Sequence, residues 1–299
     1  MGSEGTRFGN NRTTDQWAAR KIFFIFFLLF ASLVAVPVYF HYQIYVVSAV
    51  AFVTLGVAIN KVVFIMHECA HGTLFTNKDL ERKVGWVCGL FLVTDFTTFK
   101  SNHLAHHSYF GLANDPQGSD YNGFEGARFS KLLWHLVRPA LGLNLFKLKD
   151  LNKNAKTDKK ANTSDVRTFL LCAGVVHLGI LFLATLGGKV WLTFPCYHLA
   201  AGTVGLFLSQ TRGFAEHISF PGGTTGQIVR THYPNILEGF FLYDFNFNYH
   251  VEHHLNPNVP AYYLPGLSES MKGQDSRAQY SKSIVFTILK RLKQSLAKA

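Results

Sequence analysis

Four long apolar runs dominate the hydropathy pattern of this chain. They cover residues 22–40, 43–60, 168–186 and 190–210, and each approaches the ~20 mostly apolar residues that a helix needs to cross a bilayer. Very short gaps, residues 41–42 and 187–189, separate the members of each pair. These gaps predict two helical hairpins whose turns lie on one side of a membrane. The first run follows a polar tail, residues 1–21, and is longer than a signal-peptide core, so we expect it to remain as a membrane anchor.

The distribution of charge assigns the two sides of that membrane. The chain carries 29 Lys and Arg residues and a formal net charge of +11. If both hairpin turns face outward, every one of these basic residues except Lys189 lies inside, as expected for cytoplasmic segments. Both termini are therefore predicted to be cytoplasmic, at the endoplasmic reticulum, a plastid or a bacterial inner membrane. Because the basic residues flank apolar runs, we expect them to face lipid headgroups and not nucleic acid.

The segments outside these runs complete the predicted architecture. Residues 84–99 are apolar but short, which predicts an interfacial or re-entrant segment, and residues 129–149 predict an amphipathic helix on the membrane face. Residues 151–165 are Lys-rich and predict an exposed linker, and the four scattered cysteines predict reduced thiols. The expected fold is an all-α membrane protein with four transmembrane helices in two hairpins and a cytoplasmic helical cap. Residues 22–299 would form one domain.

Nine of the 14 histidines gather in four short segments on the predicted cytoplasmic side, namely HECAH, HLAHH, AEH and HVEHH. Residues three or four apart share a helix face, so each HxxxH or HxxHH segment points its imidazoles in one direction. No helix-breaking residue follows the second run, so its helix should continue into HECAH. We predict a metal site in the cap with these ligands: His67, His71, His103, His106, His107, His217, His250, His253 and His254.

The number of histidines indicates how many metal ions the site holds. Imidazole suits iron, zinc, copper and nickel alike, but a zinc site takes only three or four protein ligands. Nine histidines therefore predict two metal ions. Nearby carboxylates are predicted to orient the ligand rings by accepting their second N–H; they are Glu68, Asp95, Asp115, Glu216 and Glu252. The remaining histidines, His41, His135, His177, His198 and His232, are expected to be structural, with interhelical hydrogen bonds for His177 and His198.

Residues 60–268 resemble the membrane fatty acid desaturase family. The strings HECAHGTLF, SNHLAHHSYFG and NYHVEHHLNPNVPAYYLPGL resemble its three histidine boxes, and RGFAEH resembles its additional histidine. The resemblance implies that the nine histidines ligate two Fe ions in a non-haem di-iron centre. Such an enzyme uses O₂ to remove two hydrogens from adjacent methylenes of a lipid acyl chain. The electrons would come from a separate cytochrome b5 or ferredoxin with its reductase, because FPGG at residues 220–223 lacks the haem histidine of a fused cytochrome domain.

Three alternatives to desaturation stay open. The same histidine pattern serves relatives that hydroxylate or ketolate lipids, sterols or carotenoids. HECAH also matches the H-E-x-x-H signature of zinc metalloproteases, with Glu68 as general base, although an intramembrane protease would leave both HxxHH segments unexplained. A metal transporter would place its ligands within the spans, near the middle of the membrane. A count of bound metals separates a di-iron oxidase, with about two irons per chain, from a zinc protease, with a single zinc.

Overall fold

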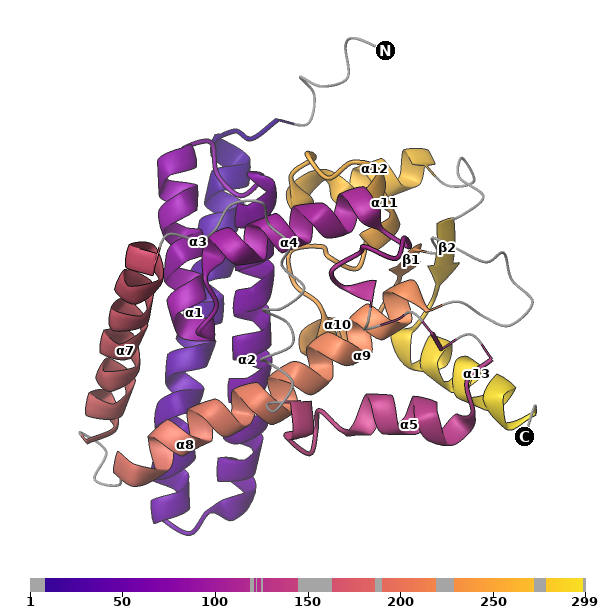
Figure 1. Ribbon diagram of the computed structural model, residues 1–299. Helices are drawn as coiled ribbons and strands as arrows, with labels where there is room; N and C mark the ends of the chain where they lie inside the picture. The colour runs from indigo at the N-terminus through magenta and orange to yellow at the C-terminus, as the bar shows by residue number, and fades with distance from the viewer. Residues whose placement is uncertain are drawn as a thin grey trace.

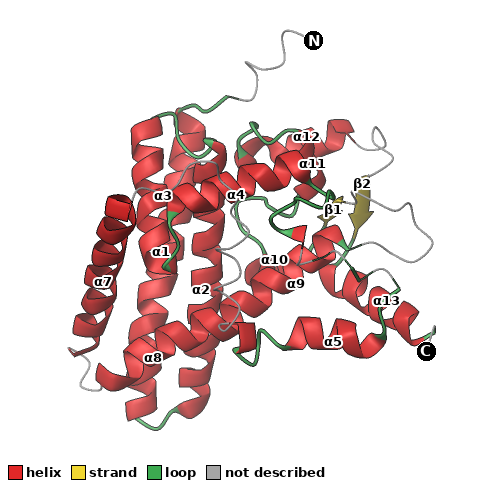
Figure 2. Ribbon diagram, in the orientation of Figure 1, coloured by secondary structure: helices red, strands yellow, loops and turns green. Residues whose placement is uncertain are grey.

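The computed structural model describes residues 9–118, 121, 123–124, 126–144, 163–185, 190–218, 229–271 and 278–297. Over these residues the protein is mostly helical (Figures 1 and 2). Its elements are α1 (Arg12–His41), α2 (Tyr45–His71), α3 (Lys78–Leu92), α4 (Phe96–Tyr109), α5 (Phe129–Val137), α7 (Thr163–Thr185), α8 (Val190–Ala200), the π-helical segment η3 (Ala201–Gly205), α9 (Leu206–His217), β1 (Val229–His232), α10 (Ile236–Leu242), α11 (His250–Leu255), the 3₁₀ helix η4 (Ala261–Tyr263), α12 (Leu264–Met271), β2 (Ala278–Ser281) and α13 (Ile284–Leu296).

The two longest helices, α1 and α2, form an antiparallel hairpin (Figure 1). Both are long and apolar enough to cross a membrane, as the first predicted hairpin requires. Helix α1 begins earlier than its apolar run, because the Asn11 side chain accepts the first backbone N–H groups and caps the helix. Residues 12–21, predicted as part of a polar tail, therefore belong to α1. Helix α2 continues without a break into HECAH, as predicted.

The second predicted hairpin is described in part. The third apolar run falls within α7 up to residue 185, and the fourth falls within the continuous run α8, η3 and α9. The turn predicted at residues 187–189 lies outside the described residues. Among the described helices, only α1 and α2 meet the length and composition needed for a span. Four transmembrane helices and a cytoplasmic cap therefore stay predictions.

A close approach joins the second hairpin to the first. A side chain at Gly56 on α2 would place its Cβ 2.4 Å from Cβ of Val204 in η3 and 3.0 Å from the carbonyl oxygen of Ala200. Glycine is thus required for the two helices to pack at this distance. The contact fixes where the α8–α9 run crosses α2, and with it the position of the C-terminal end of α9.

The segments between and after the hairpins depart from the sequence-based expectations in detail. Residues 84–99 are divided between α3 and α4, because the chain turns at Val93, which has a φ of 50°. The helix predicted at residues 129–149 is present as α5, which ends at Val137; residues 145–149 and most of the linker, residues 151–162, lie outside the described part. The protein is also not entirely α-helical, since β1 and β2 pair in parallel, with Val229 opposite Ala278.

A buried ion-pair cluster ties the segment before α11 to the first hairpin. Lys61 on α2 donates to Oδ2 of Asp244 at 2.9 Å and to the carbonyl oxygen of Tyr243 at 2.7 Å, and Lys21 on α1 donates to Oδ1 of Asp244 at 2.8 Å. Burial alone would raise the pKa of Asp244, but the two lysines outweigh it and hold that pKa below its ordinary value. This cluster positions the third histidine segment against α2.

Candidate metal centre

Four helices bring all nine predicted histidines into one place. Helix α2 supplies His67 and His71 on successive turns, α4 supplies three, α9 supplies one from its last residue, and α11 supplies three. Gly72 follows His71 with a φ of 74° and ends α2. Glycine takes this left-handed conformation without strain. Each histidine segment is helical, so the HxxxH and HxxHH spacing acts as the sequence predicts.

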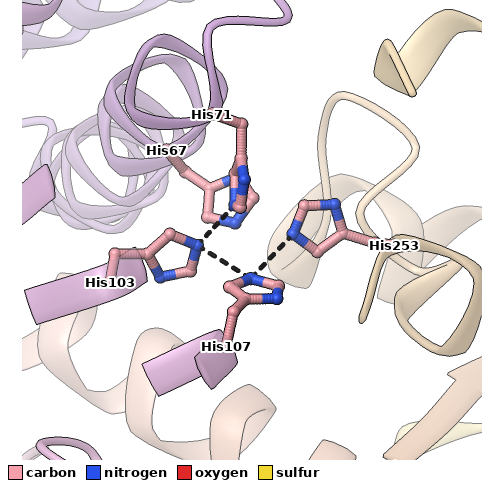
Figure 3. Close-up of side chains that lie close together, drawn as sticks. All are labelled: His67, His71, His103, His107 and His253. Carbon is pink, nitrogen blue, oxygen red and sulfur yellow. Dashed lines mark hydrogen bonds between the residues drawn. The ribbon is translucent and has the colours of Figure 1, made fainter. Parts of the chain in front are cut away.

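The first group contains five imidazoles, contributed by α2, α4 and α11: His67, His71, His103, His107 and His253. Figure 3 shows their rings converging from these separate elements. One nitrogen from each ring lies within 4.8 Å of the others. The Nε2 atom of His103 is 2.7 Å from Nε2 of His71 and 3.1 Å from Nε2 of His107. Converging Nε2 atoms from three helices are the arrangement that a metal ion requires.

A second group lies directly beside the first. It joins His106, His217 and His254, and an overlapping set joins His217 and His250 with Glu216; within each set the ligand atoms lie within 4.8 Å of one another. The Nε2 atom of His250 is 3.0 Å from that of His217 and 3.1 Å from that of His254. The rings of His107 and His254 stack at a centroid distance of 4.3 Å, so the groups touch.

Two of the predicted carboxylates fix the orientation of ligand rings. Glu68 lies 3.0 Å from Nδ1 of His67, and Asp115 lies 3.0 Å from Nδ1 of His106. A ring that donates its Nδ1–H to a carboxylate keeps a lone pair on Nε2. The Nε2 atom of His67 is buried and has no hydrogen-bond partner among the described residues. A buried lone pair of this kind fits a metal ligand.

Burial lowers the pKa of every imidazole in the five-histidine group and so favours the neutral rings. Burial, aided by the neighbouring His71, lowers the pKa of His107 to about 2. Burial likewise lowers the pKa of His103 well below its ordinary value. Buried imidazoles in the neutral form have lone pairs available for a cation, whereas imidazolium has none. The donor set therefore fits metal ions that bind nitrogen.

The other three predicted carboxylates take different positions. Asp95 accepts the backbone N–H of Thr98 and caps α4, so its observed role is not the predicted one. Glu252 accepts a hydrogen bond from the hydroxyl of Thr231 and so joins α11 to β1. As with Asp95, this partner is not a ligand ring. Glu216 lies in the second group itself. Burial raises its pKa to about 8 against the opposing effect of Arg212.

Several residues that the sequence analysis missed support the site. The hydroxyl of Tyr121 donates to Asp115, and the hydroxyl of Thr73 donates to Glu68 at 3.0 Å. Arg212 donates to Oε2 of Glu216 at 2.9 Å. Only this last pair had a signal in the sequence, because residues four apart on a helix can form an ion pair.

The histidines predicted to be structural lie away from these groups. His177 on α7 bonds to the carbonyl oxygen of Leu90 on α3 at 3.1 Å, which is the interhelical bond expected of it, and its ring stacks on His198. His232 is 3.2 Å from the hydroxyl oxygen of Thr287. These rings connect neighbouring elements of the fold and join neither imidazole group.

The fold and the site define a helical protein with two adjacent imidazole groups able to hold metal ions. The family described as fatty acid desaturase has a model that matches residues 43–283, so this chain belongs to the fatty acid desaturase family. The family expected from the sequence, and the enzyme class it carries, an oxidoreductase, are confirmed.

Curated relatives are similar at low identity. The sphingolipid delta(4)-desaturase/C4-monooxygenase DES2 of Rattus norvegicus is 28% identical over 218 residues, which cover 69% of this chain and 60% of that protein. The sphingolipid delta(4)-desaturase DES1 of Pongo abelii is 29% identical over 208 residues, which cover 67% of this chain and 58% of that protein. A fatty acid desaturase of Bacillus subtilis (strain 168) is 24% identical over 226 residues (69% and 63%). The matched part of the chain thus spans about 60% of the first of these relatives.

Proposed function

We propose that this protein is an O₂-dependent desaturase that introduces a double bond into the acyl chain of a lipid. The observation that carries the proposal is the presence of two adjacent imidazole groups in a member of the fatty acid desaturase family. Two bound iron ions would supply the oxidation of an unactivated C–H bond. Nine histidines in two groups match the ligand demand of two metal ions better than that of one.

The residues of the chain would bind, orient and shield this centre. The nine histidines are the proposed ligands, and Glu68 and Asp115 hold two of them in the tautomer that presents Nε2. The ring of Phe247 lies 4.6 Å from that of His67 and 4.9 Å from that of His250. Phe110 lies 4.7 Å from His217. Apolar rings at these positions exclude water from the reacting C–H bond.

The proposed setting is a membrane crossed by four helices. Phe23 on α1 is 74% exposed and Leu171 on α7 is 72% exposed. Large exposed apolar faces on a soluble protein are uncommon and support contact with lipid. We assign the apolar part of α7 and residues 190–210 of the α8–α9 run as the third and fourth spans. The histidine-bearing cap and both termini would then lie in the cytoplasm. Residues 22–299 would then act as one domain.

The names of the curated relatives support a lipid substrate, since they are desaturases of sphingolipids and of fatty acids. Electrons would come from a separate cytochrome b5 or ferredoxin with its reductase. The formal net charge of +11 favours an acidic protein partner of this kind.

Hydroxylation of a lipid is the second candidate reaction. It is supported by the relative from Rattus norvegicus, which is named both as a desaturase and as a C4-monooxygenase. Both reactions begin at a C–H bond and need the same two imidazole groups. The two candidates differ in the product, a double bond or a new hydroxyl group, which mass spectrometry separates directly.

The zinc protease alternative gains no support from the geometry. Glu68 lies at Nδ1 of His67, and its other oxygen is occupied by Thr73, whereas a general base must reach a metal-bound water. Replacing Glu68 by Gln discriminates the two. The change abolishes a protease but only weakens an oxidase in which Glu68 orients a ligand.

Lipid profiling tests the proposal. The protein is expressed in a host with its reductase and electron donor, and acyl lipids are analysed by mass spectrometry with localisation of double bonds. A matched His253→Ala variant, which lacks one ligand of the five-histidine group, is the inactive control. We expect a new unsaturated or hydroxylated lipid only with the parent protein. Identical lipids in the two strains, with both proteins present in the membrane, would contradict the proposal.

A further inference from the structure

We propose that Glu216 is itself a metal ligand, completing the second group with a carboxylate oxygen. The two metal positions would then differ in chemistry. One has five imidazoles, and the other has the imidazoles of His106, His217, His250 and His254 together with one carboxylate. This inference rests on the proposed pair of metal ions.

The proposal rests on which ring nitrogen, Nδ1 or Nε2, each carboxylate faces. Glu68 and Asp115 lie at Nδ1 of their histidines, the nitrogen that points away from the centre, at 3.0 Å. Glu216 instead faces Nε2 of His250, with Oε2 at 3.7 Å. Nε2 of His250 is also the atom that approaches Nε2 of His217 and Nε2 of His254. Glu216 therefore lies on the side of the ring where the ligand nitrogens converge, which is not the place of an orienting carboxylate.

The second oxygen of the Glu216 carboxylate points to the same role. Glu216 is 1% exposed, and its Oε1 atom is buried without a hydrogen-bond partner among the described residues. A buried carboxylate oxygen without a donor is costly unless a cation or proton satisfies it. Arg212 occupies only Oε2, at 2.9 Å. A metal ion bound between Glu216 and the neighbouring imidazoles would satisfy the remaining oxygen.

Arg212 fixes the direction of this carboxylate. Its guanidinium lies over the rings of Phe64 and Phe247, at 4.8 and 4.4 Å from their centroids. A guanidinium stacked between two rings has little freedom, so the hydrogen bond to Glu216 has a defined geometry. Because carboxylates suit harder ions than imidazole does, the two metal positions would also differ in their electronic properties.

The competing explanation is that Glu216 exists only to pair with Arg212. The two roles predict different results from Arg212→Gln, which removes the ion pair but leaves the carboxylate. If Glu216 is a ligand, this variant still binds both metal ions when iron is saturating, although the affinity of the second site falls because Arg212 no longer orients the carboxylate. If Glu216 is only a partner of Arg212, then Arg212→Gln and Glu216→Gln have the same effect.

The experiment measures iron in purified, folded protein loaded anaerobically with ⁵⁷Fe(II). The parent, Glu216→Gln and Arg212→Gln are compared with Glu238→Gln. Glu238 is a buried glutamate that accepts a hydrogen bond from Ser283 and belongs to neither imidazole group. Glu216→Gln should reduce bound iron from about two to about one per chain, because a lost ligand removes most of the affinity of one site. In the Mössbauer spectrum one of two quadrupole doublets should disappear. Arg212→Gln and Glu238→Gln should keep both.

Two results would overturn the inference and leave the proposed function intact. The first is a parent and a Glu216→Gln variant that both bind two iron ions with the same spectrum. The second is loss of the same iron from Arg212→Gln as from Glu216→Gln. A parent protein that binds fewer than two iron ions would instead contradict the proposed function itself.

Discussion

Replacing Asp115 by Asn tests how the second group is held in place. The carboxylate of Asp115 accepts hydrogen bonds from three groups. Nδ1 of His106 lies 3.0 and 3.1 Å from its two oxygens, the backbone N–H of Gln117 donates at 2.9 Å, and the hydroxyl of Tyr121 also donates. Burial would raise the pKa of Asp115, but the bonds from His106, Tyr121 and Gln117 outweigh it and hold the pKa below its ordinary value. The carboxylate is therefore ionised at neutral pH. Asparagine keeps one acceptor oxygen and loses the charge.

The expected cost follows from these bonds. A hydrogen bond to a charged group contributes roughly 1.5–3 kcal/mol, and loss of a carboxylate that orients a ligand histidine lowers metal affinity roughly 10–100-fold. The second figure corresponds to about 1.4–2.7 kcal/mol, so the two agree. Because His106 belongs to the second group only, Asp115→Asn should weaken one metal site by this factor. The five-histidine group should keep its affinity.

An anaerobic titration of metal-free protein with Fe(II), in competition with a chelator of known affinity, measures both sites. Asp79→Asn is the matched control. Its carboxylate pairs with Arg82 on the surface of α3, where both side chains are 73% exposed, and such pairs contribute ~0–1 kcal/mol. If Asp115→Asn binds both irons within twofold of the parent, or weakens both sites equally, the proposed orienting role is refuted.

Three further substitutions test the site and the framework that positions it. His103→Ala removes the ring whose Nε2 lies 2.7 Å from Nε2 of His71 and 3.1 Å from Nε2 of His107, and it should abolish lipid oxidation. His41→Ala, at the hairpin turn, should leave lipid oxidation unchanged. Product formation in membranes measures both, and an active His103→Ala would contradict the assignment. Lys61→Met removes the buried one of the two lysines that bind Asp244. Because Lys21 still pairs with this carboxylate, the free energy of unfolding should fall by roughly 1.5–3 kcal/mol. Thermal melting in detergent measures this, and an unchanged melting temperature would contradict it. Gly56→Ala should destabilise the protein by about 1–3 kcal/mol, because the added methyl group clashes with η3. Gly213→Ala should be neutral or stabilising, because a Cβ added there meets nothing within 4 Å. Equal melting temperatures for the two variants would refute the close packing at Gly56.

The histidine groups could be predicted because their signal is local. HxxxH and HxxHH place imidazoles on one face of a helix, and α2, α4 and α11 are helical at these positions. The continuation of α2 into HECAH followed from the lack of any helix-breaking residue after the apolar run. These features need no knowledge of distant contacts, so the sequence was enough to gather the nine residues into one hypothesis.

Which of the five carboxylates orient ligand rings could not be predicted, because that depends on tertiary geometry. Asp95 and Asp115 are both close to the second histidine segment in sequence. Asp95 precedes α4 and caps it, while the chain beyond α4 turns back and brings Asp115 to His106. Adjacency in sequence likewise does not reveal that Glu216 faces Nε2 of His250 and not Nδ1.

The strand pair escaped prediction for a similar reason. Each strand has four residues, and the paired residues Val229 and Ala278 are far apart in the chain. A strand this short is too brief to establish an alternating pattern. The pairing matters for the site, since Thr231 on β1 binds Glu252 on α11.

The most direct test of the account is the identity and number of metal ions in the purified protein. Elemental analysis of folded chain, prepared anaerobically with iron supplied, should find about two iron ions per chain, as two imidazole groups require, and substitution of any of the nine histidines should lower that value. A single zinc ion per chain, or a metal content that does not respond to these substitutions, would contradict the central claim.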